Sequence, residues 1–466
     1  MTQATIKFGT SGWRAILSDE FTFANVTRVL NAIILYLREN GLTDQAVMVG
    51  SDTRFMSDKF REYASEHFAR HGINVLCTDR DCPTPVISFY IRKNKLAGGI
   101  NFTASHNPAE YQGIKFSPAN GAPAPPEVTA RIEALIDAEV APADRQGTIK
   151  MIDPREDYFT ELQTFLDFDT LMKAELKVAC DVLYGAGRGY LDEMMHRAGA
   201  EVSCLHDYIN PSFGGRRPEP APENLEELTA MVKEKGLNLG LSTDGDADRF
   251  GIVDGDGTFY NANNVLCLVA WHLLKNRKKS GKIVRTVATT GYLDRIAGYF
   301  DTSIIEVPVG FKYIGPLIDG GGVILGGEES GGLSIGGHIP EKDGILACGL
   351  VAELVAFEGK SLGAIWKDIE TAIGPIWSDR IDLELTHQKK DAILSALAVQ
   401  DTSEFIGRPV QQFNGVDGYK FVFGAADWVL IRPSGTEPII RCYFESSDAE
   451  QGERMKQTLL KFIEAC

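Results

Sequence analysis

Short apolar runs that lead into a small-residue turn and then a helical pattern recur along this chain. Three such runs predict buried strands, at residues 46–50, 176–180 and 282–286. The helical patterns that follow them cover residues 58–70, a stretch through Met194 and Met195, and residues 293–299. Strand, turn and helix in this repeated order predict an α/β fold with three related α/β domains, whose sheets are mixed and mainly parallel.

The C-terminal part of the chain has a different pattern. Residues 380–385 and 418–423 alternate between apolar and polar positions, as antiparallel strands do, and residues 453–466 have the spacing of an amphipathic helix. We therefore expect a smaller α+β domain there. Together with the Pro-rich stretch at 122–126, these patterns place the four domains at residues 1–145, 146–256, 257–372 and 373–466.

The composition indicates the class of protein and the compartment in which it is expected. Of the 466 residues, 44% are hydrophobic and 24% are charged, which is ordinary for a soluble globular protein. No apolar run is long enough for a membrane span, and the N-terminal residues lack the pattern of a signal peptide. The eight cysteines form no C-x-x-C pair, so free thiols in a reducing compartment are expected. We predict a cytoplasmic protein that acts as a monomer or homodimer.

The net charge limits the partners. A formal charge of −17 repels nucleic acid and anionic membranes, so we expect neither as a partner. An enzyme with this charge that acts on a phosphorylated small molecule must concentrate its cations in local sites. Arginines and lysines within or beside Gly-rich loops match that requirement.

The stretch Thr103-Ala-Ser-His-Asn-Pro108 is the first candidate for chemistry. It follows an apolar run, and a loop of this composition can present the Ser105 hydroxyl as a nucleophile. His106 is a candidate catalytic neighbour, either as a base or by holding the loop. The alternative is a turn that only makes local hydrogen bonds.

The stretch Asp244-Gly-Asp-Ala-Asp-Arg249 is a more specific candidate, in this case for a metal site. In an extended segment, Asp244, Asp246 and Asp248 point the same way, so their oxygens can converge on one hard cation. A calcium EF-hand is excluded, since Arg249 and Gly255 occupy the positions that require Gly and Glu. Magnesium is the expected ion, and a solvated acidic turn is the alternative.

Two further Gly-rich loops carry polar groups suited to a sugar phosphate. Residues 326–332 place Glu328 and Ser330 between glycines, where they can grip vicinal hydroxyls, although a flexible turn has the same composition. Residues 432–438, Arg-Pro-Ser-Gly-Thr-Glu-Pro, follow a strand-like run and form an anion cradle or a polar hairpin turn. No Walker A motif is present, so nucleotide binding has little support.

In chain order, these loops resemble the α-D-phosphohexomutase family, the phosphoglucomutases and phosphomannomutases. The resembling stretches are residues 9–14 (Gly-Thr-Ser-Gly-Trp-Arg), 103–108, 244–249, 327–332 and 432–438. The resemblance thus covers nearly the whole chain. It implies an intramolecular phosphotransferase with three similar α/β domains and a smaller C-terminal one.

The resemblance also implies roles for single residues. Ser105 corresponds to the phosphoserine and would complete a Mg²⁺ site with Asp244, Asp246 and Asp248. Lys115 is similar to the family's general acid/base, and Arg14 and Arg249 to its active-site arginines. The implied substrate contacts are Glu328 and Ser330 at the C3 and C4 hydroxyls, Arg432, Ser434, Gly435 and Thr436 at the non-reacting phosphate, and Lys312 and Lys342.

Small departures from the family pattern blur the subfamily. Gln112, Trp13 and Ala15 stand where other residues are common, while residues 327–332 and 338–344 look more like glucose-handling members than like the phosphoglucosamine branch. A dual-specificity phosphoglucomutase/phosphomannomutase stays open, because glucose and mannose differ at C2.

The implied reaction passes through a hexose 1,6-bisphosphate, which also serves as activator. A lysine near Arg249 and Mg²⁺ is expected to have a lowered pKa suited to a base. Two rival functions use the same loops. One is a synthase or phosphatase that releases its product after one transfer, and the other is a non-catalytic sugar-phosphate-binding protein.

Overall fold

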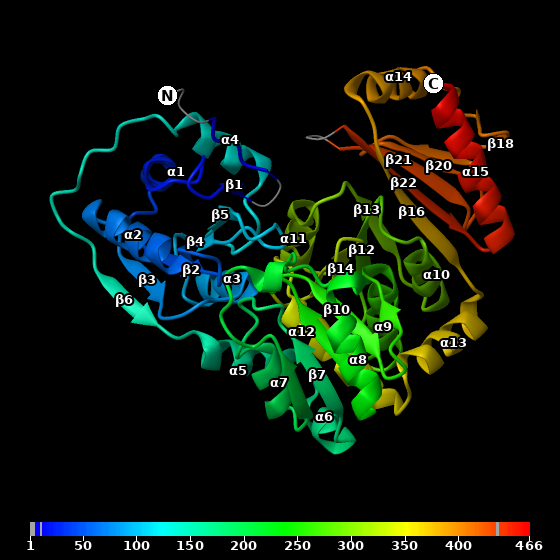
Figure 1. Cartoon of the computed structure of the whole chain (residues 1–466), viewed down its shortest axis with the longest axis horizontal. Helices are drawn as coiled ribbons and strands as arrows, with labels where there is room; N and C mark the ends of the chain where they lie inside the picture. The colour runs from blue at the N-terminus through cyan, green and yellow to red at the C-terminus, as the bar shows by residue number, and fades with distance from the viewer. Residues whose placement is uncertain (1–4, 10–11, 435–437) are drawn as a thin grey trace.

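The computed structural model of the chain describes residues 5–9, 12–434 and 438–466. Its strands form four main sheets with their own helices, named here domains I to IV in chain order (Figure 1). The three α/β domains with mixed sheets and the smaller C-terminal domain confirm the predicted fold class. The predicted domain boundaries stay predictions.

Domain I has a six-stranded sheet in the order β1-β5-β4-β2-β3-β6. Its strands β2, β3, β4 and β6 are parallel, whereas β5 runs antiparallel to both β4 and β1. The elements are β1 (Trp13–Ile16), α1 (Phe23–Glu39), β2 (Val47–Ser51), α2 (Ser57–Arg70), β3 (Val75–Thr78), α3 (Thr84–Lys93), β4 (Gly98–Phe102), β5 (Tyr111–Pro118), α4 (Pro126–Ala134) and β6 (Ile149–Ile152).

Domain II has a five-stranded sheet in the order β11-β10-β9-β7-β8. Strands β7, β8 and β9 are parallel, and β9 and β10 form an antiparallel hairpin. The elements are α5 (Arg155–Phe165), α6 (Phe168–Ala174), β7 (Lys177–Asp181), α7 (Leu191–Arg197), β8 (Glu201–Leu205), η1 (Phe213–Gly215), η2 (Pro222–Asn224), α8 (Glu226–Lys235), β9 (Leu239–Thr243), β10 (Phe250–Asp254) and β11 (Phe259–Tyr260).

Domain III has a four-stranded sheet in the order β13-β12-β14-β15, with only the β14–β15 pair antiparallel. Its helices α9 and α12 start where Asn261 and Asp343 cap the first turn through their side chains. The elements are α9 (Ala262–Lys275), β12 (Lys282–Thr286), α10 (Tyr292–Tyr299), β13 (Ile304–Val307), α11 (Phe311–Asp319), β14 (Val323–Glu328), β15 (Gly332–Ile335), α12 (Gly344–Glu358) and α13 (Leu362–Ile373).

Domain IV has a five-stranded antiparallel sheet in the order β16-β22-β21-β20-β19. Figure 1 shows it set apart from the other three, in orange and red. The elements are β16 (Trp377–Glu384), α14 (His387–Ala398), β17 (Glu404–Phe405), β18 (Arg408–Pro409), β19 (Gln412–Asn414), β20 (Tyr419–Val422), β21 (Trp428–Pro433), β22 (Ile439–Ser446) and α15 (Ala449–Ala465).

The hydrophobic cores show which domains are joined most firmly. One large cluster of buried side chains is continuous through domains II and III and reaches α3 of domain I. Helix α12 is buried over most of its length and packs on α6 and β10 of domain II as well as on α9 of its own domain. Domain IV has a core of its own. Domains II and III therefore form a fixed base, on which the loops at the ends of their strands are held. No helix in the described ranges combines the length and apolar character needed to cross a bilayer.

Candidate active site

Ser105 lies in a tight turn between β4 and β5. Its backbone φ is +51°, a left-handed conformation that costs a non-glycine residue about 1 kcal/mol. The turn is held locally, because the Ser105 amide donates to Thr103 Oγ1 at 2.9 Å and the Asn107 amide donates to the Ala104 carbonyl at 3.1 Å. The predicted nucleophile is thus fixed, buried and under backbone strain, which is common at functional sites.

The three aspartates lie in the hairpin loop that joins β9 to β10. The expectation that they share an extended segment is wrong. The loop turns sharply, with an Ala247 φ of +58° and a hydrogen bond from the Ala247 amide to the Asp244 carbonyl. The turn brings the carboxylates together all the same. One oxygen from each lies within 4.8 Å of the others, and all three residues are buried.

Domain packing brings the serine to the aspartates. Ser105 Oγ donates to Asp244 Oδ2 at 2.8 Å, although the two residues are 139 positions apart. Gly245 allows this approach, because a Cβ there would lie only 2.6 Å from the Ser105 carbonyl oxygen. The hydroxyl therefore sits directly beside the acidic group. Within the described residues, no other set of three or more His, Cys, Asp or Glu is so disposed.

The acidic group has oxygens suited to a divalent cation. Asp246 Oδ1 and Asp248 Oδ1 are buried without a hydrogen-bond partner among the described residues. Leaving buried charged oxygens unpaired is costly, so such atoms usually bind a ligand. Three carboxylates and one hydroxyl make a hard-oxygen donor set of the kind that Mg²⁺ prefers. The residues present fit the ion.

Two lysines occupy the other oxygens. Lys115 Nζ on β5 donates to Asp246 Oδ2 at 2.5 Å and to Asp248 Oδ2 at 2.7 Å. Lys342 Nζ lies 3.2 Å from Asp248 Oδ2 and 2.9 Å from Glu341 Oε1. The predicted acid/base lysine and one predicted substrate contact thus meet at the aspartate loop.

These charges set the pKa values of the carboxyls. Burial raises the pKa of Asp244 well above its ordinary value, and the charges of Asp246 and Asp248 add to this shift. Burial acts the same way on Asp248, but Lys115 and Lys342 outweigh it, so the pKa of Asp248 falls below its ordinary value. The Asp248 carboxylate is therefore negatively charged at neutral pH.

The pKa of Lys115 differs from the sequence-based expectation. Burial alone lowers the pKa of Lys115, but Asp246 and Asp248 outweigh burial and the net shift is upward. The expected lowering assumed bound Mg²⁺ beside the lysine; with the two carboxylates alone in contact with the ammonium, the shift is upward. Pairing across domains could not be foreseen from local spacing.

His106 and the arginines border the serine. Burial, followed by the charges of Arg249 and Arg14, lowers the pKa of His106 to about 2, which makes it a weak base. Its Nδ1 lies 3.3 Å from Ser105 Oγ. Arg14 Nη1 donates to Asn107 Oδ1 at 2.7 Å, and the Arg249 amide donates to Asp244 Oδ1 at 3.0 Å. The imidazole is therefore neutral. It lies within reach of the Ser105 hydroxyl and is influenced by the charges of Arg249 and Arg14.

The predicted sugar contacts lie on domain III. Glu328 ends β14 and is buried; burial raises its pKa, and the charge of Lys342 opposes that shift. Ser330 hydrogen-bonds with Glu328 and is half-buried. Lys312 is half-buried on the first turn of α11, with its ammonium 5.2 Å from the centre of the Tyr313 ring. The charge of Lys342 therefore acts directly on Glu328, which is the hydrogen-bond partner of Ser330.

The predicted phosphate cradle lies on domain IV. Arg432 is on β21, where its Nε donates to Asp417 Oδ2 at 3.0 Å. The Ser434 amide donates to the Ile439 carbonyl at 2.9 Å. Gly435 and Thr436 lie outside the described residues. The cradle thus belongs to a different domain from the serine and the aspartates.

Several residues at the site carried no sequence-based prediction. Thr84 Oγ1 donates to Asp246 Oδ2 at 2.5 Å, and Glu219 Oε1 lies 3.4 Å from Arg249 Nη1. Arg441 on β22 is the cross-strand partner of Arg432, which places a second guanidinium at the cradle. Of these three residues, only Arg441 left a signal, because it lies in the apolar, strand-like run that begins at Ile439, directly after the cradle loop.

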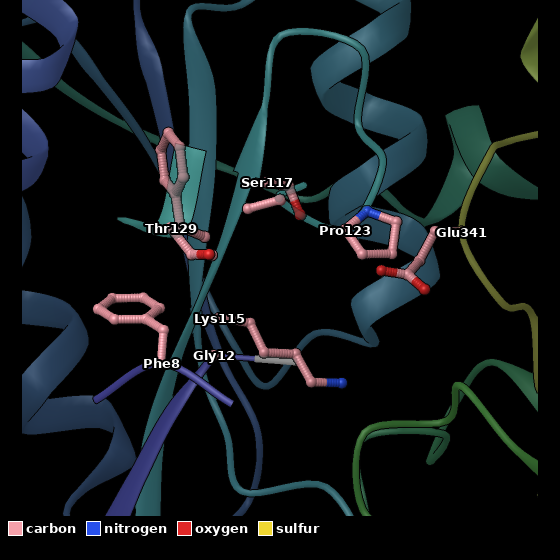
Figure 2. A pocket seen from close by; sticks show the side chains of 9 residues that line it. Phe8, Gly12, Lys115, Ser117, Pro123, Thr129 and Glu341 are labelled. Atoms are coloured by element: carbon pink, nitrogen blue, oxygen red, sulfur yellow. The ribbon is translucent and has the colours of Figure 1, made fainter. Parts of the chain in front are cut away.

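A small cavity borders Lys115. Figure 2 shows the lysine between Phe8 and Glu341, with Ser117, Pro123 and Thr129 around the same space. Its volume of about 20 Å³ has room for about one water molecule. A cavity of this volume is too small for a hexose phosphate.

Comparison with known proteins identifies the family. Profiles of the phosphoglucomutase/phosphomannomutase domains match in order: domain I at residues 5–142, domain II at 156–257, domain III at 261–373 and the C-terminal domain at 384–461. A probable phosphoglucosamine mutase of Methanothermobacter thermautotrophicus is 31% identical over 98% of this chain and 97% of its own. A phosphoglucomutase of Komagataeibacter xylinus is 30% identical over 95% and 87%.

A solved structure agrees over the whole chain. The crystal structure of a Thermus thermophilus protein assigned to the phosphomannomutases is 35% identical, covers 99% of this chain and all of its own, and superposes with a TM-score of 0.86. These three proteins carry three different sugar names, so the comparisons give the reaction type without the sugar. The chain belongs to the phosphoglucomutase/phosphomannomutase family and is an enzyme of the intramolecular phosphotransferase type.

Proposed function

We propose that this enzyme interconverts hexose 1-phosphate and hexose 6-phosphate, with glucose as the preferred sugar, through phosphorylated Ser105 and a hexose 1,6-bisphosphate. The observation that carries the proposal is the contact of Ser105 Oγ with Asp244, beside two further buried aspartates. A hydroxyl in this position can exchange a phosphoryl group next to a bound cation.

Asp244, Asp246 and Asp248, with the serine oxygen, would hold Mg²⁺. The ion would supply positive charge opposite the phosphoryl oxygens, which is its main contribution to phosphoryl transfer. Arg14 and Arg249 add fixed positive charge on either side of the serine. Their guanidinium groups offset the charge of about −1.5 to −2 that phosphoserine brings into the site.

Lys115 is the proposed acid/base. When the sugar hydroxyl attacks the phosphoserine, the bond from phosphorus to Ser105 Oγ breaks and a bond to the sugar oxygen forms. The hydroxyl proton passes to Lys115, and Ser105 Oγ takes a proton from the same lysine as it leaves. Lys115 accepts a proton only when neutral. The charges of Asp246 and Asp248 raise its pKa, so offsetting these charges by a cation bound to the two carboxylates would favour this role.

The second half of the reaction needs the bisphosphate in the opposite orientation. We assign Glu328, Ser330, Lys312 and Lys342 to contacts with the sugar. The cradle of Arg432, Ser434, Gly435 and Thr436 is assigned to the phosphate that does not react. Domain IV has a core of its own and shares only a smaller apolar cluster with domain III, so a hinge before β16 would let the cradle adjust to both orientations.

The sugar preference can be tested directly. We expect kcat/KM for glucose 1-phosphate to exceed that for mannose 1-phosphate and for glucosamine 1-phosphate by at least about tenfold, the usual effect of one misplaced hydroxyl or amine. Steady-state assays on the three substrates decide this. Equal values for glucose and mannose would establish dual specificity, and a preference for glucosamine would refute the assignment of glucose.

The same assays separate a mutase from a synthase or a binding protein. A mutase returns hexose 6-phosphate and keeps free bisphosphate at catalytic levels. Accumulation of free hexose 1,6-bisphosphate would identify a synthase, and absence of any turnover by metal-loaded enzyme would identify a binding protein.

Arg432→Ala tests the phosphate cradle. Because a charge-assisted bond to phosphate contributes about 1.5–3 kcal/mol, we expect KM to rise about 10- to 100-fold with a smaller change in kcat. Arg408→Ala is the matched control, since Arg408 pairs with Asp427 and stacks on Phe423 within the same domain. The control should keep its KM. An Arg432→Ala enzyme with unchanged KM would remove Arg432 from the cradle.

A further inference from the structure

Arg54 belongs to the turn after β2, at the carboxyl edge of the domain I sheet. Its sequence context, Ser51-Asp-Thr-Arg54, marks a turn and carries no known chemistry. The residue is only 3% exposed, which is unusual for an arginine and calls for a specific set of partners.

The partners are the backbone of the turn that carries the serine. Nη2 of Arg54 donates to the carbonyl oxygens of Ser105 at 2.7 Å and of Asn107 at 2.6 Å. Nη1 donates to the carbonyl oxygens of Pro108 at 2.7 Å and of Tyr111 at 3.0 Å. One guanidinium thus gathers four carbonyls of the turn, from the serine itself to the first residue of β5.

The guanidinium is itself fixed in place. Arg54 Nε donates to Asp52 Oδ2 at 3.2 Å, and Asp52 Oδ1 accepts from the Arg54 amide at 2.9 Å and from Ser57 Oγ at 2.9 Å. The Asp52 amide donates to the Phe102 carbonyl at 2.9 Å. On the other side, the Phe213 ring of domain II lies 4.9 Å from Arg54 Cζ. Arg54 therefore cannot move independently of the turn.

We propose that Arg54 is a positioning residue, which holds Ser105 in its strained conformation so that Oγ faces Asp244 and can exchange a phosphoryl group. The inference rests on the proposed function, because it gives the orientation of Ser105 a role in catalysis. The left-handed φ of Ser105 is unfavourable on its own, and the bonds from Arg54 to the carbonyls of Ser105 and Asn107 offset that cost at the serine and directly after it.

Lysine cannot replace the arginine here. An ammonium keeps the charge but is a compact group, whereas the planar guanidinium reaches four oxygens from two nitrogens. In Arg54→Lys we expect part of the turn to lose its anchor and Oγ to shift relative to Asp244. A misplacement of about 1 Å at a reacting atom can cost about a hundredfold in rate.

The test uses full-length enzyme and radiolabelled glucose 1,6-bisphosphate. Rapid quenching measures the rate of phosphoryl transfer to Ser105, and steady-state assays measure kcat and KM for glucose 1-phosphate. In Arg54→Lys, we expect the transfer rate and kcat to fall by at least about tenfold, with KM within about threefold of wild type. In Arg54→Ala, the transfer rate and kcat should fall further.

Arg61→Lys is the matched control. Arg61 is also a buried arginine of domain I, but it donates to Ser51 Oγ and to the Arg80 carbonyl rather than to the serine turn. The control should transfer phosphate within about twofold of wild type, even where its melting temperature falls as much as that of Arg54→Lys. Equal losses of transfer in both variants would reduce Arg54 to a general stability role and overturn the inference.

Labelling of the wild-type enzyme and of Arg54→Lys distinguishes a wrong mechanism from a wrong role of Arg54. If wild-type enzyme takes up no label at Ser105, the proposed phosphoserine mechanism is wrong. If wild-type enzyme is labelled and Arg54→Lys is labelled as quickly, the mechanism stands and the positioning role of Arg54 is wrong.

Discussion

Ser105→Ala enzyme is expected to form no phosphoenzyme and to lose activity by about three to six orders of magnitude, the usual result of removing a covalent nucleophile. The reason is that the Ser105 hydroxyl is the group of this turn that contacts Asp244, at 2.8 Å. Labelling with radioactive glucose 1,6-bisphosphate, followed by peptide mapping, measures the first quantity, and a coupled mutase assay measures the second.

Ser88→Ala provides the control for this experiment. Ser88 is a buried serine of domain I whose Oγ donates to the Gly121 carbonyl at 2.6 Å, away from the aspartate loop. Its loss should cost about 1 kcal/mol of stability and leave labelling intact. Stoichiometric labelling of the Ser105→Ala protein would refute the assignment of the nucleophile.

Removing divalent metal should abolish activity, and adding Mg²⁺ should restore it. The reason is the pair of buried oxygens, Asp246 Oδ1 and Asp248 Oδ1, which lack a partner among the described residues. Asp246→Asn and Asp248→Asn each remove one anionic ligand. We expect each to raise the Mg²⁺ concentration for half-maximal activity by at least about tenfold. Calorimetric titration with Mg²⁺ alone measures the same loss without relying on turnover.

Asp254→Asn separates loss of metal from loss of structure. Asp254 is equally buried, but its carboxylate accepts from the amides of Leu362 and Gly363 and therefore anchors α13. This variant should be less stable with an unchanged Mg²⁺ requirement. Full activity of wild-type enzyme in excess EDTA would rule out the metal role of the three aspartates.

Much of the fold could be predicted from local patterns. The helix expected at residues 58–70 is α2 (Ser57–Arg70), and the strand expected at 282–286 is β12 (Lys282–Thr286). The helix has an apolar periodicity that marks its buried side, and the strand is a short run that is buried at consecutive positions. The shared core of domains II and III could not be predicted, since the apolar sequence of α12 shows that it is buried without showing against what.

The family resemblance implied that Ser105 meets the three aspartates, whereas the spacing of residues within each loop did not. The family resemblance named Ser105, the three aspartates, Lys115 and the substrate loops as candidates. It did not indicate Arg54, because the four bonds of this residue go to backbone carbonyls, which have no sequence signature. Local spacing also did not indicate the ion pairs of Lys115, which reach into another domain and raise its pKa.

The sequence by itself determined the chemical groups and the order of the loops that carry them, because residue type and local spacing set what each loop can bind. Tertiary structure alone decided that Ser105 meets Asp244 across 139 positions and that Lys115 meets Asp246 across 131. Such contacts depend on how the β4–β5 turn of domain I packs against the β9–β10 loop of domain II. Part of that packing is the apolar contact of α3 with domain II, whose partner residues local patterns do not encode.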